Sequence, residues 1–291
     1  MISTHVFRHE AMNTEWEMVV AQEEVTEAAA RSAARLVFAE VDRLEEELSR
    51  FRPISDVWRL SLLKAGESTT VDFAAWDCLN LAKAVHKETG GAFDITLGPM
   101  MRLWRNSDGS PRIPLPQELD VVRNRMGMHL FDLEEDGLRV TAHATDMRFD
   151  LGAVGKGYAL DQALHVLEEQ GITSALISAG ESSIVAVGSP GEEGGWSVDL
   201  HLDPPRTIQL DGNALSCSGF AVQGAHIMNP RTLSPVPIRE HRSYVLAPTA
   251  ALSDALSTAF MVMSEDEVLE FCARHPQVKW LGGAVSGGLE E

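Results

Sequence analysis

The order of the expected elements predicts an α+β fold, in which mixed or antiparallel sheets pack against helices. Two helical segments come first, and groups of strands with two further helices follow. The 291 residues are 44% apolar, and no break in composition marks a linker. We therefore expect one domain over residues 1–291, with a glycine-rich tail at about 282–291 that does not promise order.

Helical spacing of apolar residues predicts the first two helices. The first covers about residues 23–50, and Pro53 is expected to end it. The second runs from Asp72, a plausible N-cap, to Gly90, a plausible C-cap. The residues expected to face inward are Val25, Ala29, Ala33, Leu36, Val41, Leu44 and Leu48 in the first helix and Trp76, Leu79, Ala82 and Val85 in the second.

The middle of the chain reads as a loop followed by strands. Prolines and polar residues predict an irregular excursion over residues 105–120. Alternating apolar residues then predict strands, bounded by acidic or glycine-rich turns. Their ranges are 127–133, 137–141, 175–178, 183–187 and 196–200.

Residues 150–171 form the segment with the clearest chemical character. Asp150 closes an expected strand that contains Met147, Phe149 and Leu151, and glycines occupy positions 152, 155 and 157. Lys156 stands where a helix is expected to begin, and Gly171 is expected to end that helix. Backbone N–H groups at a helix start favour phosphate, and glycine lets it approach. A plain strand-to-helix turn explains the same residues equally well, because the spacing fits neither the P-loop nor the dinucleotide fingerprint.

Charge and cysteine content narrow the range of partners. With 43 acidic and 24 basic residues the net charge is −19, which argues against nucleic acid as a partner. Three cysteines far apart indicate no disulfide framework or zinc spacing, and we expect small buried residues at Cys78, Cys217 and Cys272. The first ten residues lack the apolar run of a signal peptide and a lipid-anchor cysteine, and no stretch predicts a membrane span. We expect a cytoplasmic protein, or an exported one if a leader preceded this sequence.

Asp254 and Thr258 lie four residues apart on an expected helix, so their side chains share one face. A carboxylate and a hydroxyl are hard oxygen donors that suit Mg²⁺. The alternative is that Ser253 or Asp254 only caps the start of this helix.

Taken together, several segments resemble one family. In chain order they are Leu48 to Pro53, Gly91 to Pro99, Asp150 to Asp161, His226 to Thr232 and Ser253 to Ala259. With these segments in register, the chain resembles the ApbE family of FAD:protein FMN transferases over about residues 12–268. The resemblance implies Mg²⁺-dependent transfer of FMN from FAD to a threonine or serine hydroxyl of a target protein, with release of AMP. An FAD pyrophosphatase and a non-catalytic FAD-binding protein remain as alternatives.

The resemblance also implies roles for individual residues. His226 is implied as the general base. Asp254 and Thr258 are implied to bind the metal with the backbone carbonyls of Ala153 and Ser257. The residues implied to contact FAD are Met12, Phe51, Ala92, Phe93, Asp94, Asp150, Lys156 and Ile227. For Phe93 and Asp94 the alternatives are a core residue and a turn cap, and for Met12 and Phe51 ordinary packing.

The acceptor side departs from the family pattern. The usual Asp-Pro-x-Thr-Gly is replaced by Asn229 to Leu233, so a carboxylate and a glycine are lost. The connection from Ser218 to His226 is also shorter than in most members. If the missing carboxylate aligns His226, we expect weaker activity.

Overall fold

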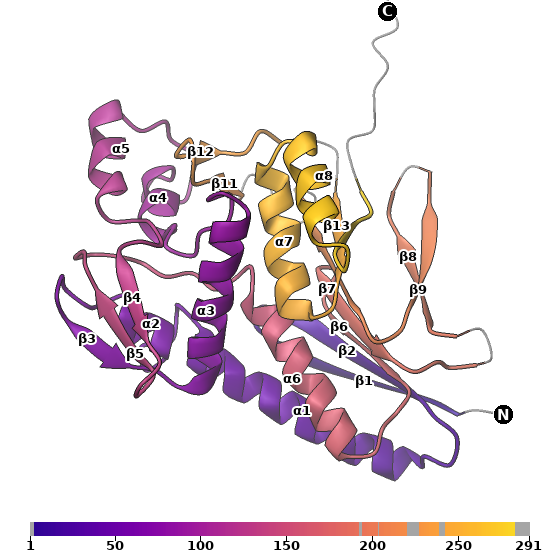
Figure 1. Ribbon diagram of the computed structural model, residues 1–291. Helices are drawn as coiled ribbons and strands as arrows, with labels where there is room; N and C mark the ends of the chain where they lie inside the picture. The colour runs from indigo at the N-terminus through magenta and orange to yellow at the C-terminus, as the bar shows by residue number, and fades with distance from the viewer. Residues whose placement is uncertain (1–2, 192–193, 203, 220–226, 239–241, 283–291) are drawn as a thin grey trace, which may run out of the picture.

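A seven-stranded antiparallel sheet forms the centre of the computed structural model, which describes residues 3–191, 194–202, 204–219, 227–238 and 242–282 (Figure 1). The expected α+β class is confirmed. In order across the sheet, the strands are β1 (Thr4–Ala11), β2 (Thr14–Ala21), β6 (Ala175–Ala179), β7 (Ser183–Val187), β10 (Ala214–Ser218), β13 (Ser243–Ala247) and β14 (Lys279–Trp280). The strands predicted at 175–178 and 183–187 are β6 and β7.

Both faces of this sheet are covered. Successive strand residues point to opposite faces, so Val185 and Val245 pack on the helical side, whereas their neighbours Ala186 and Tyr244 pack on the other side. Helices α1 (Glu27–Leu48), α6 (Gly155–Glu169) and α7 (Ala250–Val262) cover the first face (Figure 1). The hairpin of β8 (Trp196–Leu200) and β9 (Arg206–Leu210) covers part of the second.

Helix α1 confirms the first predicted helix, but its buried stripe is shifted. Leu36 is 46% exposed and Ala29 is also exposed, so these two predicted inward positions are wrong. The buried positions follow a different 3.6-residue row, which includes Phe38. They are Ala30, Ala33, Ala34, Val37, Phe38, Val41, Leu44 and Leu48. The helix ends at Leu48 with Ser49 as its C-cap, before Pro53 is reached.

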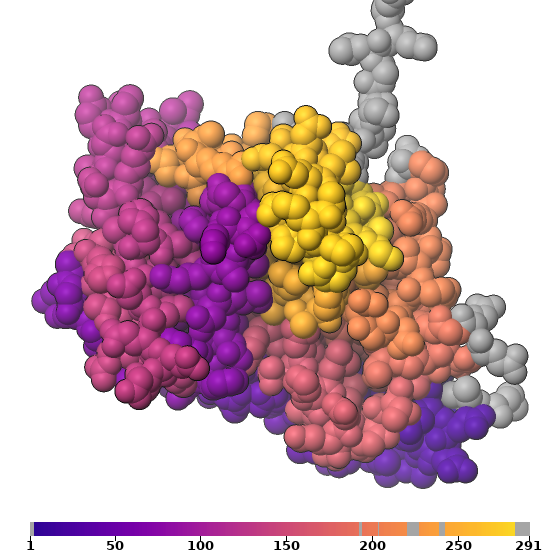
Figure 2. Space-filling view, in the orientation of Figure 1, coloured from indigo at the N-terminus to yellow at the C-terminus, as the bar shows by residue number. Residues whose placement is uncertain are grey.

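Helix α3 (Phe73–Glu88) matches its prediction closely. Asp72 is the N-cap residue, Gly90 adopts a positive φ of 57° just past the helix end, and the four predicted inward residues are buried. Helix α8 (Glu265–Arg274) lies beside α3 (Figure 2), and Arg274 of α8 forms an ion pair with Glu88 of α3. Cys78 in α3 is fully buried as expected, whereas Cys217 and Cys272 are only partly buried.

A smaller sheet and short helices complete the fold. Strands β3 (Ser68–Thr70), β5 (Arg139–Ala142) and β4 (Phe131–Glu134) pair in that order, which confirms the predicted strand pair after residue 127. The remaining elements are α2 (Asp56–Leu60), α4 (Gly98–Leu103), α5 (Pro116–Arg123), β11 (Met228–Asn229) and β12 (Ser234–Pro235). The loop predicted over 105–120 is wrong from residue 116, because Pro116 starts a helix that Glu118 caps.

The strand expected before Asp150 is not a regular strand. Residues 147–151 form no regular strand, and they are joined to the segment 91–99 by hydrogen bonds from Asp150 N–H to Ile95 O (2.7 Å) and from Gly98 N–H to Arg148 O (3.2 Å). Met147, Phe149 and Leu151 are buried as the alternation predicted. The alternation of apolar residues therefore predicted their burial correctly. The two backbone hydrogen bonds to 91–99 are too few to form a regular β-ladder. The tail at 283–291 lies outside the described residues.

Candidate functional site

The turn that precedes α6 is closed by polar contacts. The Asp150 carboxylate accepts a hydrogen bond from Gly152 N–H (2.9 Å), and its other oxygen lies 3.3 Å from the Arg50 guanidinium. The Lys156 ammonium donates to the carbonyl of Gly152 (3.2 Å). A lysine is thereby held at the helix start, where the backbone already favours an anion.

Two glycines of this turn have different roles. A Cβ on Gly155 would meet Leu48 Cδ1 at 3.9 Å, an ordinary contact, so packing against the described residues does not require glycine there. A Cβ on Gly157 would collide with the carbonyl oxygen of Ala250 and stand 2.7 Å from the Cα of Ala251. The glycine that permits a close approach is therefore Gly157, and the approaching element is α7.

Asp254 does not cap its own helix. Thr249 caps α7, its hydroxyl accepting from Leu252 N–H (3.3 Å), and the Ser253 hydroxyl donates to a carbonyl of β13. Asp254 lies in the second turn, is 4% exposed, and accepts a hydrogen bond from Gly157 N–H (3.2 Å). The capping alternative is therefore wrong, and the carboxylate faces the start of α6.

Three hydroxyl groups lie together near this carboxylate. Ser218 Oγ is 2.9 Å from Ser257 Oγ and 3.0 Å from Thr258 Oγ1, and the Ser257 hydroxyl donates to the backbone carbonyl of Asp254. Ser218 ends β10, and sequence reasoning did not select it. Its signal was its place at the end of a strand, just before the segment that leads to His226.

Burial raises the pKa of Asp254, while the positive charge of Lys156 and the hydrogen bond from Gly157 act in the opposite direction. A buried carboxylate that shares a helix face with hydroxyls fits a hard divalent cation, whose charge would offset the cost of desolvation. Within the described ranges, no three His, Cys, Asp or Glu side chains cluster as a metal site. The fit to Mg²⁺ thus rests on one carboxylate and on the hydroxyl groups that lie on its helix face.

The segment implied to line FAD is packed into the protein. Ala92 and Phe93 are buried, and the Asp94 carboxylate accepts from the N–H (2.7 Å) and hydroxyl (2.6 Å) of Thr96. Burial raises the pKa of Asp94 although the bonds from Thr96 oppose it. The contacts of Phe93 are therefore those of a core residue, and the contacts of Asp94 are those of a residue that stabilises a turn. The backbone bonds between 91–99 and 147–151 still place this segment beside Asp150.

The other implied FAD contacts lie in different surroundings. Phe51 is 74% exposed, and the Arg50 guanidinium lies 4.5 Å from its ring centroid. Since Arg50 also pairs with Asp150, it links these two predicted positions. Met12 is half-buried in the turn between β1 and β2, with a φ of 51°. Ile227 is buried beside Met261 of α7, and His226 lies outside the described residues.

A sequence profile of the ApbE family matches residues 12–281. The chain belongs to the ApbE family. Among relatives, an FAD:protein FMN transferase of Klebsiella pneumoniae (strain 342) is 28% identical over 274 residues, which cover 88% of this chain and 77% of that protein. One of Salmonella typhimurium is 26% identical over 290 residues, covering 94% and 82%.

Solved structures of the ApbE family share the fold. The flavin transferase ApbE from Vibrio cholerae superposes with a TM-score of 0.82 at 20% identity, covering 98% of each chain. The ApbE protein from Thermotoga maritima gives a TM-score of 0.79 at 24% identity, covering 97% of this chain and 96% of that one. In the part of this chain that is described, no helix is both long and apolar enough to cross a membrane.

The turn that departs from the ApbE pattern is intact. The Asn229 side-chain oxygen accepts from Arg231 N–H (2.9 Å) and Thr232 N–H (3.3 Å), the role a carboxylate would fill there. Leu233 has a φ of 56°, a conformation that favours glycine, and its side chain is buried. Asn229 thus takes over the hydrogen bonds that the family's carboxylate would accept in this turn. Leu233, which replaces the glycine, is held in a strained conformation.

Arg231 joins this turn to the end of α3. Its guanidinium donates to the carbonyls of Thr89 (2.6 Å) and Gly90 (3.0 Å) and to the Glu267 carboxylate of α8 (2.7 Å). Carbonyls at a helix end lack helical partners, so an arginine there satisfies them. The contact connects the segment after His226 with the segment that begins at Gly91.

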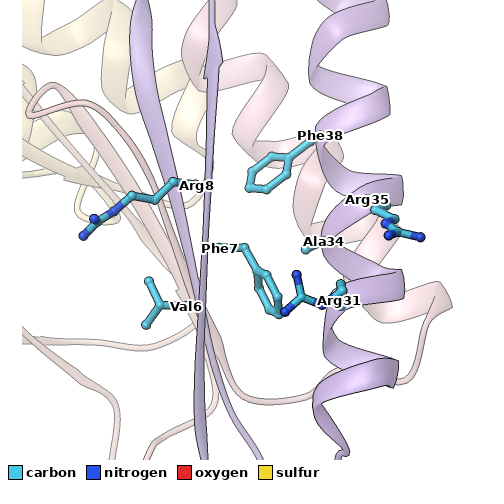
Figure 3. Close-up of a pocket in the computed structure, with 7 residues that line it drawn as sticks. All are labelled: Val6, Phe7, Arg8, Arg31, Ala34, Arg35 and Phe38. Carbon is cyan, nitrogen blue, oxygen red and sulfur yellow. The ribbon is translucent and has the colours of Figure 1, made fainter.

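Two surface hollows lie away from these residues. One of about 310 Å³ opens between β1 and α1, where Arg31 lies beside Phe7 and Phe38 lies further along α1 (Figure 3). Arg31 pairs with Glu27, so part of its charge is already matched. The other, of about 560 Å³, is lined by residues of the β8–β9 hairpin and its connection. Neither hollow is lined by a predicted site residue.

Proposed function

We propose that this chain transfers FMN from FAD to a threonine or serine hydroxyl of an acceptor protein and releases AMP. Its relatives from Klebsiella pneumoniae and Salmonella typhimurium bear the name FAD:protein FMN transferase. The observation that carries the proposal is the buried Asp254, which accepts the Gly157 N–H at the start of α6. A cation site next to a glycine-lined helix start suits a pyrophosphate, because both features attract phosphate.

The proposed metal is Mg²⁺, held by the Asp254 carboxylate, the Thr258 hydroxyl and the backbone carbonyls of Ala153 and Ser257. When bound, it would withdraw charge from the pyrophosphate oxygens. Lys156 supports the same oxygens with a second positive charge, which does not need strict geometry. Ser218 orients the hydroxyls of Ser257 and Thr258 through its two contacts.

The proposed FAD contacts divide between the two ends of the dinucleotide. Asp150 and Lys156 serve the adenine-nucleotide part, as the family resemblance implies. Phe51 has an exposed ring that is free to stack on an aromatic system. The other proposed contacts of FAD are Met12, Ala92, Phe93, Asp94 and Ile227.

The proposed chemistry makes one bond and breaks one. The acceptor hydroxyl oxygen attacks the FMN phosphorus, the bond to the bridging oxygen breaks, and its electron pair leaves with AMP. The hydroxyl proton passes to the imidazole of His226, whose ordinary pKa suits a base near neutral pH. The product is a flavoprotein linked through a phosphoester.

Incubation with FAD and Mg²⁺, with and without an acceptor domain, tests this function. We expect AMP together with a covalently fluorescent acceptor. AMP without labelled acceptor would assign an FAD pyrophosphatase, and FAD binding without AMP would assign a binding protein.

A His226→Ala variant separates the base from the binding site. We expect it to retain FAD and to lose roughly 10²–10⁴ in transfer rate, the usual contribution of a general base. Transfer at the wild-type rate would contradict this assignment.

A cytoplasmic location also remains a prediction from the sequence, to be tested by cell fractionation.

A further inference from the structure

Helices α6 and α7 each contribute a carboxylate that accepts backbone N–H groups from the start of the other helix. On α6, Asp161 accepts from Ala250 N–H (2.7 Å) through one oxygen and from Ala251 N–H (2.9 Å) through the other. In return, Asp254 of α7 accepts from Gly157 N–H of α6 (3.2 Å). The pairs 157/161 and 250/254 each span about one helical turn, so one turn of α6 is matched to one turn of α7.

Asp161 satisfies the start of α7. The first backbone N–H groups of a helix have no partner within it. In α7 the N–H groups of Ala250 and Ala251 donate to Asp161, and the N–H of Leu252 donates to the Thr249 hydroxyl. The N–H of Ser253 makes the first intrahelical hydrogen bond, to Thr249 O (3.0 Å). Ala250 and Ala251 are buried, at 0% and 4% exposure, so water cannot readily replace the carboxylate.

Backbone contact leaves little freedom for another arrangement. The Gly157 position has no room for a Cβ against Ala250, so the two helices touch at this point without side chains between them. The position of α7 along α6 then depends on the hydrogen bonds that flank the contact, which Asp161 accepts on one side and Asp254 accepts on the other.

We propose that Asp161 is a positioning residue that sets the register of α7 against α6. It thereby places Asp254, Ser257 and Thr258 opposite the turn that holds Lys156. Asp161 acts through α7 and not by touching the substrate. The part of this inference that concerns metal binding rests on the proposed function.

Two substitutions of Asp161 test the proposal. Asp161→Ala removes both acceptor oxygens, and Asp161→Asn keeps one. A matched control, Glu168→Gln, removes an exposed carboxylate from the same helix. Val140→Ala truncates a buried side chain of β5, away from the α6–α7 contact. It therefore measures how a general loss of stability affects Mg²⁺ binding.

Mg²⁺ affinity is measured by calorimetry on each full chain well below its unfolding temperature. We expect affinity to fall by roughly 10–100-fold in Asp161→Ala, as for other residues that orient metal ligands, and by less in Asp161→Asn. Glu168→Gln and Val140→Ala are expected to bind Mg²⁺ like the wild type. Affinity in Asp161→Ala within twofold of the wild type, or an equal loss in Val140→Ala, overturns the proposal.

Hydrogen exchange of the amides at 250–254 gives a readout that needs no ligand. We expect loss of protection in the Asp161 variants and none in Glu168→Gln. Unchanged protection in Asp161→Ala overturns the register assignment. If Asp161→Ala does not fold, Asp161→Asn decides by both measurements. A wild-type chain that binds no Mg²⁺ would refute the metal assignment, and exchange alone would then decide the role of Asp161.

Discussion

Asp94 and Asp254 are both buried carboxylates, and their partners separate their roles. Asp94 receives the N–H and hydroxyl of Thr96, two residues away, and so stabilises its own turn. Asp254 receives a backbone N–H from another helix and shares a face with hydroxyls. Burial raises the pKa of each, but only Asp254 stands among further oxygen donors. This difference favours Asp254 as the cation ligand.

Asp254→Asn removes the charge while keeping the size and an oxygen for Gly157. We expect Mg²⁺ binding to be lost and the thermal midpoint to stay or rise, because burying a charge costs more than burying an amide. Calorimetry and thermal unfolding measure the two effects on one protein. Asp266→Asn, an exposed change on α8, is the control. Normal Mg²⁺ affinity in Asp254→Asn would refute the ligand assignment.

Leu233→Gly tests whether strain or packing dominates at the altered turn. A left-handed conformation costs a non-glycine residue about 1–3 kcal/mol. Truncating a buried leucine costs about 2–5 kcal/mol, so we expect the glycine variant to be less stable despite the relief of strain. Denaturant unfolding measures the difference. A more stable variant would show that the side chain of Leu233 contributes little.

At the scale of elements, the α6–α7 pair organises the site. Helix α6 brings the glycine turn and Lys156, and α7 brings Asp254, Ser257 and Thr258. Strand β10 adds Ser218 at its end. Arg231 ties the turn after His226 to the end of α3, which leads into the segment at 91–99. The segments 91–99, 150–161 and 227–232 therefore each contact a helix end.

Gly155→Ala and Gly157→Ala should have opposite effects. Gly155 has ordinary space for a methyl group, so alanine there gains up to about 1 kcal/mol of helix propensity. At Gly157 the methyl group would force α6 and α7 apart, and we expect a lower melting temperature and weaker FAD binding. Thermal unfolding and FAD fluorescence titration check both. Equal behaviour of the two variants would contradict the close contact seen at Gly157.

At the scale of the whole molecule, one hydrophobic cluster connects both sheets. It includes Phe131 and Val140 of the small sheet and Val185 and Val245 of the large one. On this basis we propose that the chain is a single domain. Residues of α6, α7 and the 91–99 segment also belong to this cluster, so a ligand that binds across them should stabilise the whole domain.

FAD with Mg²⁺ should therefore raise the melting temperature of the full chain. Saturation at 100 times the dissociation constant corresponds to about 2.7 kcal/mol of added stability. We expect the shift to shrink when EDTA removes the metal, because charge on the pyrophosphate is then less well matched. Thermal unfolding with FAD alone, Mg²⁺ alone and both together measures this. An identical shift with FAD in EDTA would argue against a metal that joins FAD to Asp254.

The sequence alone determined the features that depend on neighbours along the chain. The spacing of Trp76, Leu79, Ala82 and Val85 predicted α3, since helix periodicity is a local property. The order of short segments from Leu48 to Ala259 placed the chain in its family before any contact was known.

Only the tertiary structure decided the features that depend on contacts between distant segments. Asp161 and Ala250 are 89 positions apart, yet one caps the helix that the other begins. The same approach of α6 to α7 made the Asp254 carboxylate an acceptor for the start of α6 instead of a cap of its own helix, and it made Gly157 the glycine at which the two helices touch. Local patterns carry no information on which helices meet at which turn, because that is settled by packing on the shared sheet.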